Sequence, residues 1–342
     1  GDLLIGGPGN DIIDGGPGID DARYARARAS HSITGNSAAF QVRALAGSDV
    51  PVARMLALCE DDSVIGTAFF VMEYVEGRVL WDGSLKELPK PERRAVYENK
   101  IATLAKLHNT DHVAIGLGDY GKPGNYFGRQ IDRWSKQYKL SETETIDEMN
   151  RLIEWLPQTI PAGERTSIVH GDYRLDNMVL HETEPRVIAV LDWELSTLGD
   201  PLGDFTYYLM NWVMPHDGRS GLGGVDLAPL GIPTLEETVK LYCAQTGRDG
   251  IPELDWYFSY NAFRLACILQ GIAGRVRDGT AASAHATQMI QRIRPLAESV
   301  GSQIILECDA TNDAHLDAVF DRLKTNWGKL DFLVHSIAFS DK

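Results

Sequence analysis

The sequence contains no apolar run approaching the roughly 20 residues that a membrane-spanning helix requires. Its first residues, GDLLIGG, lack the charged and apolar regions of a secretory signal peptide. Basic residues are outnumbered, since 33 Lys and Arg stand against 48 Asp and Glu and give a formal net charge of −15. No basic stripe of the kind that binds nucleic acid is present. The sequence therefore predicts a cytoplasmic protein that partners neither membrane nor nucleic acid.

Cysteine is also scarce. The four cysteines, Cys59, Cys243, Cys267 and Cys308, are scattered without any CxxC spacing. This pattern excludes a zinc ribbon and a disulfide framework, and it fits a reducing compartment. We expect these side chains to pack in a core, which a chain of 342 residues with 44% hydrophobic content can build.

Glycine and aspartate are concentrated at the start of the chain. GGPGND from Gly6 is echoed nine residues later by GGPGID from Gly15, and this repeat resembles the haemolysin-type calcium-binding repeat. The resemblance implies Ca²⁺ ligands at Asp11 and Asp20. Because each ion in such repeats is shared between stacked turns, two copies should not complete a site. We therefore expect residues 1–24 to be a Gly-rich fragment without an ion, followed by a polar linker over residues 25–37.

Residues 38–288 have the patterns of a folded α+β domain, in which β-branched strand segments precede long apolar helices. The predicted strands lie within 63–77, 165–172 and 185–194, and the predicted helices within 93–111, 200–213 and 253–276.

Two short motifs follow neighbouring predicted strands. HGDYRLDN occupies residues 170–177, and LDWE occupies residues 191–194. Phosphoryl transfer requires placement of an acceptor hydroxyl and cations that absorb phosphate charge. A carboxylate at Asp172 can accept the hydroxyl proton, while the oxygens of Asn177 and Asp192 suit Mg²⁺. The spacing therefore favours kinase chemistry.

The full stretches VHGDYRLDNMVL and AVLDWELSTLGDPLGDF resemble the aminoglycoside phosphotransferase and choline kinase family. They are nearest to the phosphotransferase-like domains found beside acyl-CoA dehydrogenases, over about residues 38–288. The resemblance implies a protein-kinase-like fold with a truncated N-lobe at 38–76 and a helical C-lobe at 77–288. It also implies ATP- and Mg²⁺-dependent transfer of the γ-phosphate to a small-molecule alcohol.

The resemblance implies a role for each motif residue. Asp172 would be the catalytic base and His170 would brace the catalytic loop, while Asn177 and Asp192 would hold magnesium. Asp200 and Asp204 would then be structural.

FVMEYVEG resembles the hinge of the same family, whose backbone at Glu73 and Val75 would bind adenine. A second nucleotide motif, GLGDYG at residues 116–121, matches GxGxxG. The residues after it, Lys-Pro-Gly, cannot open the helix on which a dinucleotide phosphate would sit. We therefore expect a plain Gly-rich connection there.

The predicted N-lobe lacks parts that the family uses to hold phosphates. No Lys precedes Lys86, and Arg43 and Arg54 are the only cations between residue 38 and the hinge. Because guanidinium does not replace a phosphate-bridging ammonium at a fixed position, ATP affinity should be poor. The alternative function is a catalytically impaired remnant or binding module, with an acceptor pocket lined by residues such as Trp212 and Tyr257.

Residues 289–342 predict a strand, a helix and a strand, as in a βαβ Rossmann fragment. The segment resembles enoyl-acyl-carrier-protein reductase, which implies an adenine contact at Asp309 and an NAD-lining loop at 336–338. The glycine-rich first strand and the catalytic Tyr and Lys are missing, so a reductase is disfavoured. The sequence thus predicts a chimeric chain of three family fragments, natural, engineered or misassembled, and it specifies neither the acceptor nor the oligomeric state.

Overall fold

The structure, a computed structural model, describes residues 37–59, 61, 69–143, 145–216, 221–277 and 332–333. The predicted calcium-binding repeat with Asp11 and Asp20, the linker and most of the predicted βαβ fragment lie outside these residues.

The described residues fall into two compact units. The small unit contains the described part of 54–74 and the strand at 332–333, and the large unit contains 40–53 and the described part of 75–274. The predicted boundary between the lobes at 76/77 lies close to this division. Residues 40–53, expected in the N-lobe, group with the large unit, where the backbone N–H of Val190 donates to the carbonyl of Pro51.

The small unit contains a sheet of strand order β1-β2-β7. Strands β1 (Met55–Cys59) and β2 (Phe69–Glu73) pair antiparallel, as their β-branched, aromatic and aliphatic residues favour. Strand β7 (Phe332–Leu333) lies within the predicted last strand of the chain and pairs antiparallel with β2. A βαβ unit would instead pair its own two strands in parallel, and the rest of that prediction falls on residues outside the description.

The large unit is mainly helical, and its elements follow the predicted periodicities. Helix α2 (Lys90–Asn109) buries Ile101, Leu104 and Leu107 on one face, as predicted, and packs against α7 (Leu235–Thr246). The remaining helices are α1 (Ser37–Leu45), α3 (Tyr126–Ser141), α4 (Asp147–Trp155), α5 (Pro201–Val213), α6 (Leu227–Leu230) and α8 (Leu254–Arg277), of which α1 and α8 each span a boundary between the units.

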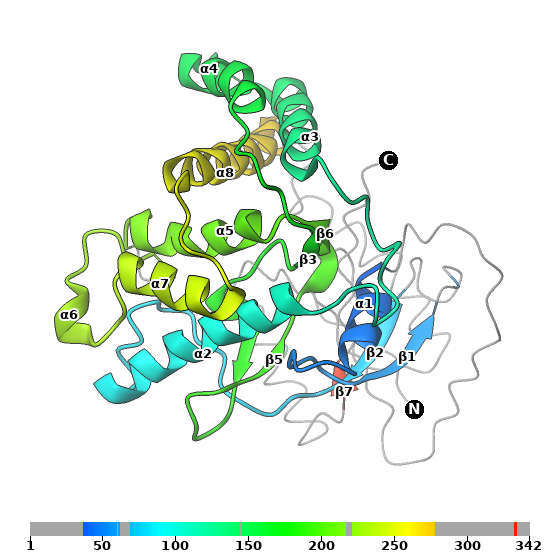
Figure 1. Ribbon diagram of the computed structural model, residues 1–342, viewed down its shortest axis with the longest axis vertical. Coiled ribbons are helices and arrows are strands. Elements are labelled where there is room, and N and C mark those ends of the chain that lie inside the picture. The colour runs from blue at the N-terminus through cyan, green and yellow to red at the C-terminus, as the bar shows by residue number, and fades with distance from the viewer. Residues whose placement is uncertain are drawn as a thin grey trace. The chain divides into compact units, whose positions relative to one another are not determined.

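Helices α3 and α8 lie side by side (Figure 1) because aromatic rings interlock between them. The ring of Phe127 lies 5.1 Å from that of Trp256 and 5.0 Å from that of Tyr260, both edge-on. Such edge-to-face pairs add to the free energy gained from apolar burial.

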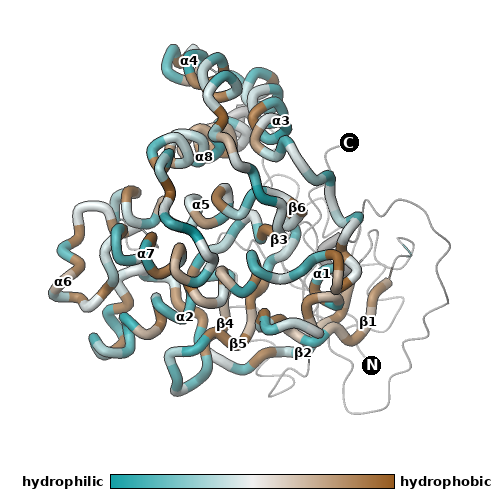
Figure 2. The backbone as a smooth tube through the Cα atoms, viewed as in Figure 1, coloured by the Kyte–Doolittle hydropathy of each residue, from teal (hydrophilic) through white to brown (hydrophobic). Residues whose placement is uncertain are grey.

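Four short strands of the large unit form two antiparallel pairs, β3 with β6 and β4 with β5. Their residues are almost all buried, and Figure 2 shows the apolar stretches in brown. The strands are β3 (Ser167–Val169), β4 (Met178–Leu180), β5 (Val187–Val190) and β6 (Thr197–Gly199), with 3₁₀ turns at η1 (Leu156–Gln158), η2 (Leu175–Asn177) and η3 (Trp193–Leu195).

Two further predictions are confirmed within the described residues. Residues 116–121 form turns, and the next helix, α3, begins only at Tyr126, so the GxGxxG match is a plain connection. Cys59, Cys243 and Cys267 are free and buried, as expected of packing residues, and Cys308 lies outside the description. None of the helices built from described residues has the length and apolar character needed to cross a bilayer.

Candidate active site

The loop after β3 turns sharply at Gly171. This residue has a φ of +85°, and a Cβ atom there would lie 2.5 Å from the carbonyl oxygen of Leu195. Only glycine tolerates both conditions. The glycine of the HGD motif therefore lets the chain turn directly beneath η3, and Asp172 follows at once.

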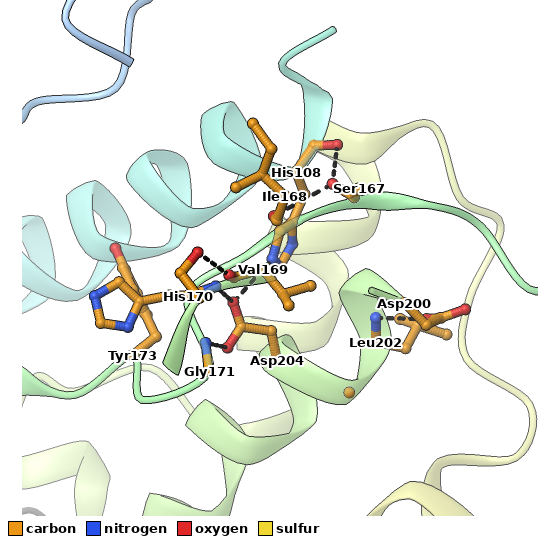
Figure 3. Close-up of polar contacts among 12 residues, drawn as sticks. His108, Ser167, Ile168, Val169, His170, Gly171, Tyr173, Asp200, Leu202 and Asp204 are labelled. Atoms are coloured by element: carbon orange, nitrogen blue, oxygen red, sulfur yellow. Dashed lines mark hydrogen bonds and ion pairs between the residues drawn. The ribbon is translucent and has the colours of Figure 1, made fainter. Parts of the chain in front are cut away.

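Asp204 of α5 holds this turn from below (Figure 3). Its carboxylate accepts the backbone N–H of His170 at 2.7 Å and that of Gly171 at 2.9 Å, and it lies 3.3 Å from Nε2 of His108. Burial alone would raise the pKa of Asp204, but these donors outweigh it and the pKa is lowered. The anionic carboxylate thus fits the predicted structural role.

The imidazole of His170 ties the loop to the end of β5. The ring is fully buried, its Nε2 lies 2.8 Å from the carbonyl of Leu191, and its Nδ1 accepts the backbone N–H of Asp172 at 3.2 Å. These partners fix one tautomer, with the proton on Nε2. These two contacts brace the loop and engage both ring nitrogens, while a catalytic role of His170 stays a prediction.

Asp172 is half-buried, and both of its carboxylate oxygens have partners. Oδ1 accepts from the hydroxyl of Tyr207 at 2.7 Å, and Oδ2 accepts from Nδ2 of Asn177 at 3.2 Å. The same Nδ2 also donates to the backbone carbonyl of Asp172 at 2.9 Å. These contacts hold the Asp172 carboxylate in one fixed orientation.

Asn177 and Asp192 are brought together by the pairing of two strands. In the antiparallel register of β4 and β5, Met178 faces Val190, and the backbone N–H of Leu191 donates to the carbonyl of Asn177 at 2.9 Å. Asp192, the next residue, adopts a left-handed conformation with φ of 63°. Such conformations in non-glycine residues cluster at functional sites.

Glu194 is a further carboxylate at this site. Although part of the residue remains exposed, desolvation raises its pKa to about 7, and repulsion from Asp192 and Asp172 adds to the shift. The three carboxylates therefore lie close enough to repel one another, which is a favourable setting for a cation. No cluster of three or more His, Cys, Asp or Glu with metal-site geometry occurs within the described part of the chain.

The predicted hinge residues lie in different units. Glu73, the last residue of β2, donates its backbone N–H to the carbonyl of Arg54 at 2.9 Å and faces Phe332 of β7. Val75 is half-buried in the large unit. Adenine binding by these two residues stays a prediction.

Trp212 and Tyr257 belong to two separate aromatic clusters. Trp212 packs edge-on against Tyr97 and Tyr208 and donates its indole N–H to the carbonyl of Pro233 at 2.8 Å, whereas Tyr257 packs against Phe127. Both side chains are buried, so they contribute to the core.

The sequence interpretation missed several residues around the loop. Tyr207 and Arg264 lie on the apolar helices α5 and α8, and Arg264 donates to the carbonyl of Gly171 at 2.6 Å. An arginine within an apolar helical pattern indicates a buried guanidinium that has a partner elsewhere in the fold, because an arginine is rarely buried without a partner. The sequence interpretation assigned no role to Glu194, although this residue belongs to the LDWE motif.

Comparison with known proteins identifies the family. The profile of the phosphotransferase enzyme family matches residues 28–236. The chain belongs to this family. A crystal structure from Ralstonia eutropha JMP134, of a protein whose name assigns it provisionally to the aminoglycoside phosphotransferases, is 56% identical, with a TM-score of 0.69, covering 77% of this chain and 80% of that chain. The predicted resemblance and kinase-like fold are thereby confirmed at the level of the family.

The curated relatives of this phosphotransferase domain are longer proteins. Acyl-CoA dehydrogenase family member 10 of Mus musculus is 43% identical over 259 residues, which are 75% of this chain and 24% of the relative. Acyl-CoA dehydrogenase family member 11 of Gallus gallus is 38% identical over 261 residues, which are 75% of this chain and 34% of the relative. The chain thus spans about a quarter to a third of these relatives.

A second family matches the C-terminal part. The enoyl-(acyl carrier protein) reductase profile matches residues 273–342. Enoyl-[acyl-carrier-protein] reductase [NADH] 2 of Rhizobium meliloti (strain 1021) is 52% identical over 52 residues, which are 15% of this chain and 19% of the relative. The predicted resemblance of this segment is confirmed, while the roles implied for Asp309 and residues 336–338 fall outside the described residues.

Proposed function

We infer that the chain is a small-molecule kinase that transfers the γ-phosphate of ATP to an alcohol. Membership of the phosphotransferase family supports the reaction class. The observation that carries the proposal is the register of β4 and β5, which places Asn177 and Asp192 at adjacent strand ends beside the Asp172 loop. This is the constellation that phosphoryl transfer needs, with a proton acceptor next to oxygen ligands for a cation.

Asp172 would act on the acceptor hydroxyl. As the hydroxyl oxygen forms its bond to the γ-phosphorus, the bond from that phosphorus to the oxygen of ADP breaks and the proton passes to the Asp172 carboxylate. The fixed orientation of the carboxylate, held by Tyr207 and Asn177, supports this role. A general base must first of all lie within hydrogen-bonding reach of the proton that it accepts.

Asn177 and Asp192 would hold magnesium, which when bound neutralises charge on the transferring phosphate. The donor set fits this ion. Nδ2 of Asn177 faces Asp172, so the amide oxygen remains for a cation, and the converging carboxylates of Asp192 and Glu194 favour a positive charge nearby. Two protein ligands suffice because Mg²⁺ usually keeps several waters.

The test is phosphate transfer from ATP to a panel of aminoglycosides, choline-like alcohols and hydroxylated acyl thioesters. We expect Asp172→Ala to lower kcat by about a hundredfold or more, since a positioned general base contributes 10²–10⁴. Asp119→Ala, an exposed aspartate in a loop, is the matched control and should keep full activity. Equal activity of both variants would refute the assignment of Asp172.

A second candidate function is a binding module without catalysis. It is favoured by the absence of lysine before Lys86 and by the pairing of Arg54, whose Nε lies 3.4 Å from the carboxylate of Glu73. Nucleotide titration with and without Mg²⁺ separates the two candidates. A kinase shows an ATP- and Mg²⁺-dependent rise in melting temperature, whereas a module with no competent ATP site shows none.

A further inference from the structure

Tyr207 of α5 makes the shortest side-chain hydrogen bond to the proposed base that the structure shows. Its hydroxyl donates to Oδ1 of Asp172 at 2.7 Å, whereas Nδ2 of Asn177 reaches Oδ2 at 3.2 Å. Tyr207 lies outside both sequence motifs, 35 residues after Asp172. The base is therefore held from a helix as well as from its own loop.

Arg264 of α8 fixes the position of Tyr207. Its guanidinium lies 4.9 Å from the centre of the Tyr207 ring and donates through Nη2 to the carbonyl of Gly171 at 2.6 Å. Only 7% of Arg264 is exposed. A buried guanidinium stacked on the ring and bonded to the loop gives the tyrosine little freedom to turn away. Figure 1 shows α5 and α8 as neighbours within the large unit.

Three charged side chains act on Asp172 from the surrounding elements. Arg264 on α8 and Arg174 at the start of η2 stabilise its negative charge, whereas Glu194 on η3 opposes it. Tyr207 on α5 is the neutral donor among these neighbours, and its pKa is raised by burial and by the negative charge of Asp172. Tyr207 thus stays protonated at neutral pH and keeps donating to the carboxylate.

We propose that Tyr207 is a positioning residue of the kinase reaction, whose hydroxyl, secured by Arg264, fixes the orientation in which the Asp172 carboxylate meets the acceptor hydroxyl. The expected kinetic effect rests on the proposed function, whereas the hydrogen bond between Tyr207 and Asp172 does not. Occupying Oδ1 leaves Oδ2, which bears only the longer bond from Asn177, as the oxygen that receives the acceptor proton.

The kinetic test compares Tyr207→Phe with Tyr208→Phe. Tyr208, the next residue, is buried, and its hydroxyl has no hydrogen-bond partner among the described residues, so it is a matched control. We expect Tyr207→Phe to lower kcat about tenfold and to leave KM for ATP within about twofold. Tyr208→Phe should change neither of these quantities.

A loss in kcat with an unchanged KM for ATP is the decisive kinetic result, since a general loss of packing would also weaken ATP binding. An unchanged kcat in Tyr207→Phe, or an equal loss in Tyr208→Phe, would overturn the proposal.

A second measurement tests the contact between Tyr207 and Asp172 without relying on catalytic activity. In urea unfolding, the combined Tyr207→Phe and Asp172→Ala variant should have an unfolding constant about tenfold below the additive expectation from the single variants, since the shared bond is lost only once. The same cycle with Tyr208→Phe should be additive. Additivity at Tyr207 overturns the proposal, whereas coupling in a protein that transfers no phosphate refutes the proposed function alone.

Discussion

Lys100 lies in the apolar interior of the large unit. Only 1% of the residue is exposed, its Nζ has no hydrogen-bond partner among the described residues, and it lies 4.9 Å from the ring centres of both Tyr97 and Tyr208. Burial lowers the pKa of Lys100 to about 7, although the charge of Asp176 acts in the opposite direction. The folded chain therefore disfavours the ammonium form that the unfolded chain retains.

This burial makes stability depend on pH. Between about pH 7 and the ordinary lysine pKa of 10.5, the unfolded chain binds a proton at Lys100 that the folded chain has lost, so the free energy of unfolding rises with pH. We expect Lys100→Met to remove this rise and to stabilise the protein at pH 7 by roughly 1–4 kcal/mol. Urea denaturation at pH 7 and pH 9 measures both effects.

Lys106→Met is the control for Lys100, because Lys106 lies exposed on the same helix. Its substitution should leave the pH dependence of the wild type in place. If Lys100→Met destabilised the protein at pH 7 or kept the full pH dependence, the ammonium would have a stabilising partner in solution.

Helix α5 is the element that organises the loop after β3. It begins at Pro201 because Asp200 caps its N-terminus, accepting the backbone N–H of Leu202 at 2.8 Å. One turn later, Asp204 accepts from the loop backbone, and Tyr207 reaches Asp172 from the turn after that. Three successive turns of one helix thus fix the helix start, the loop and the proposed base.

Asp204→Asn should loosen this arrangement. The aspartate accepts backbone N–H groups on both oxygens, whereas asparagine offers one acceptor and would point its amide donors at another donor. We expect a loss of about 2–4 kcal/mol in the free energy of unfolding at pH 7, measured by urea denaturation. Asp249→Asn, on an exposed loop, should lie within about 0.5 kcal/mol of the wild type.

The pH dependence of Asp204 provides an internal check. Its folded pKa is lowered, so its contribution is present above the ordinary carboxyl pKa of 3.8 and is lost as pH falls further. Asp204→Asn should therefore lose less stability than the wild type between pH 5 and pH 3. An unchanged acid profile would contradict the anchoring role.

At the scale of the whole molecule, charge repulsion opposes the compact state. The formal net charge is −15 at pH 7, and the sequence pI is about 5.0. We expect the melting temperature at pH 7 to rise when NaCl increases from 0.01 M to 0.15 M, because the screening length falls from about 30 Å to about 8 Å. The rise should amount to a few degrees, roughly 2–4 °C for each kcal/mol regained.

The same salt step at pH 5.0 serves as the comparison. Near the pI the net repulsion is small, so the melting temperature should change less than at pH 7. A larger response at pH 5.0 would show that local ion pairs, and not net charge, govern the salt dependence.

The sequence by itself determined the local parts of the site. Asp172 and Asn177 lie five residues apart on one loop, and Asp192 follows the neighbouring strand, so short-range geometry and the pairing of adjacent strands bring them together. The helices over 90–109 and 201–213 could also be predicted from the sequence, because apolar periodicity and a proline or aspartate at the helix start are local signals.

Only the tertiary structure decided which distant side chains complete the site. Tyr207 and Arg264 reach the loop across 35 and 93 residues, and Lys100 is buried by aromatic rings of its own helix and of α5. Periodicity marks the buried face of a helix but does not specify the side chain packed opposite it. That choice depends on how the helices pack against one another, which no local stretch of sequence encodes.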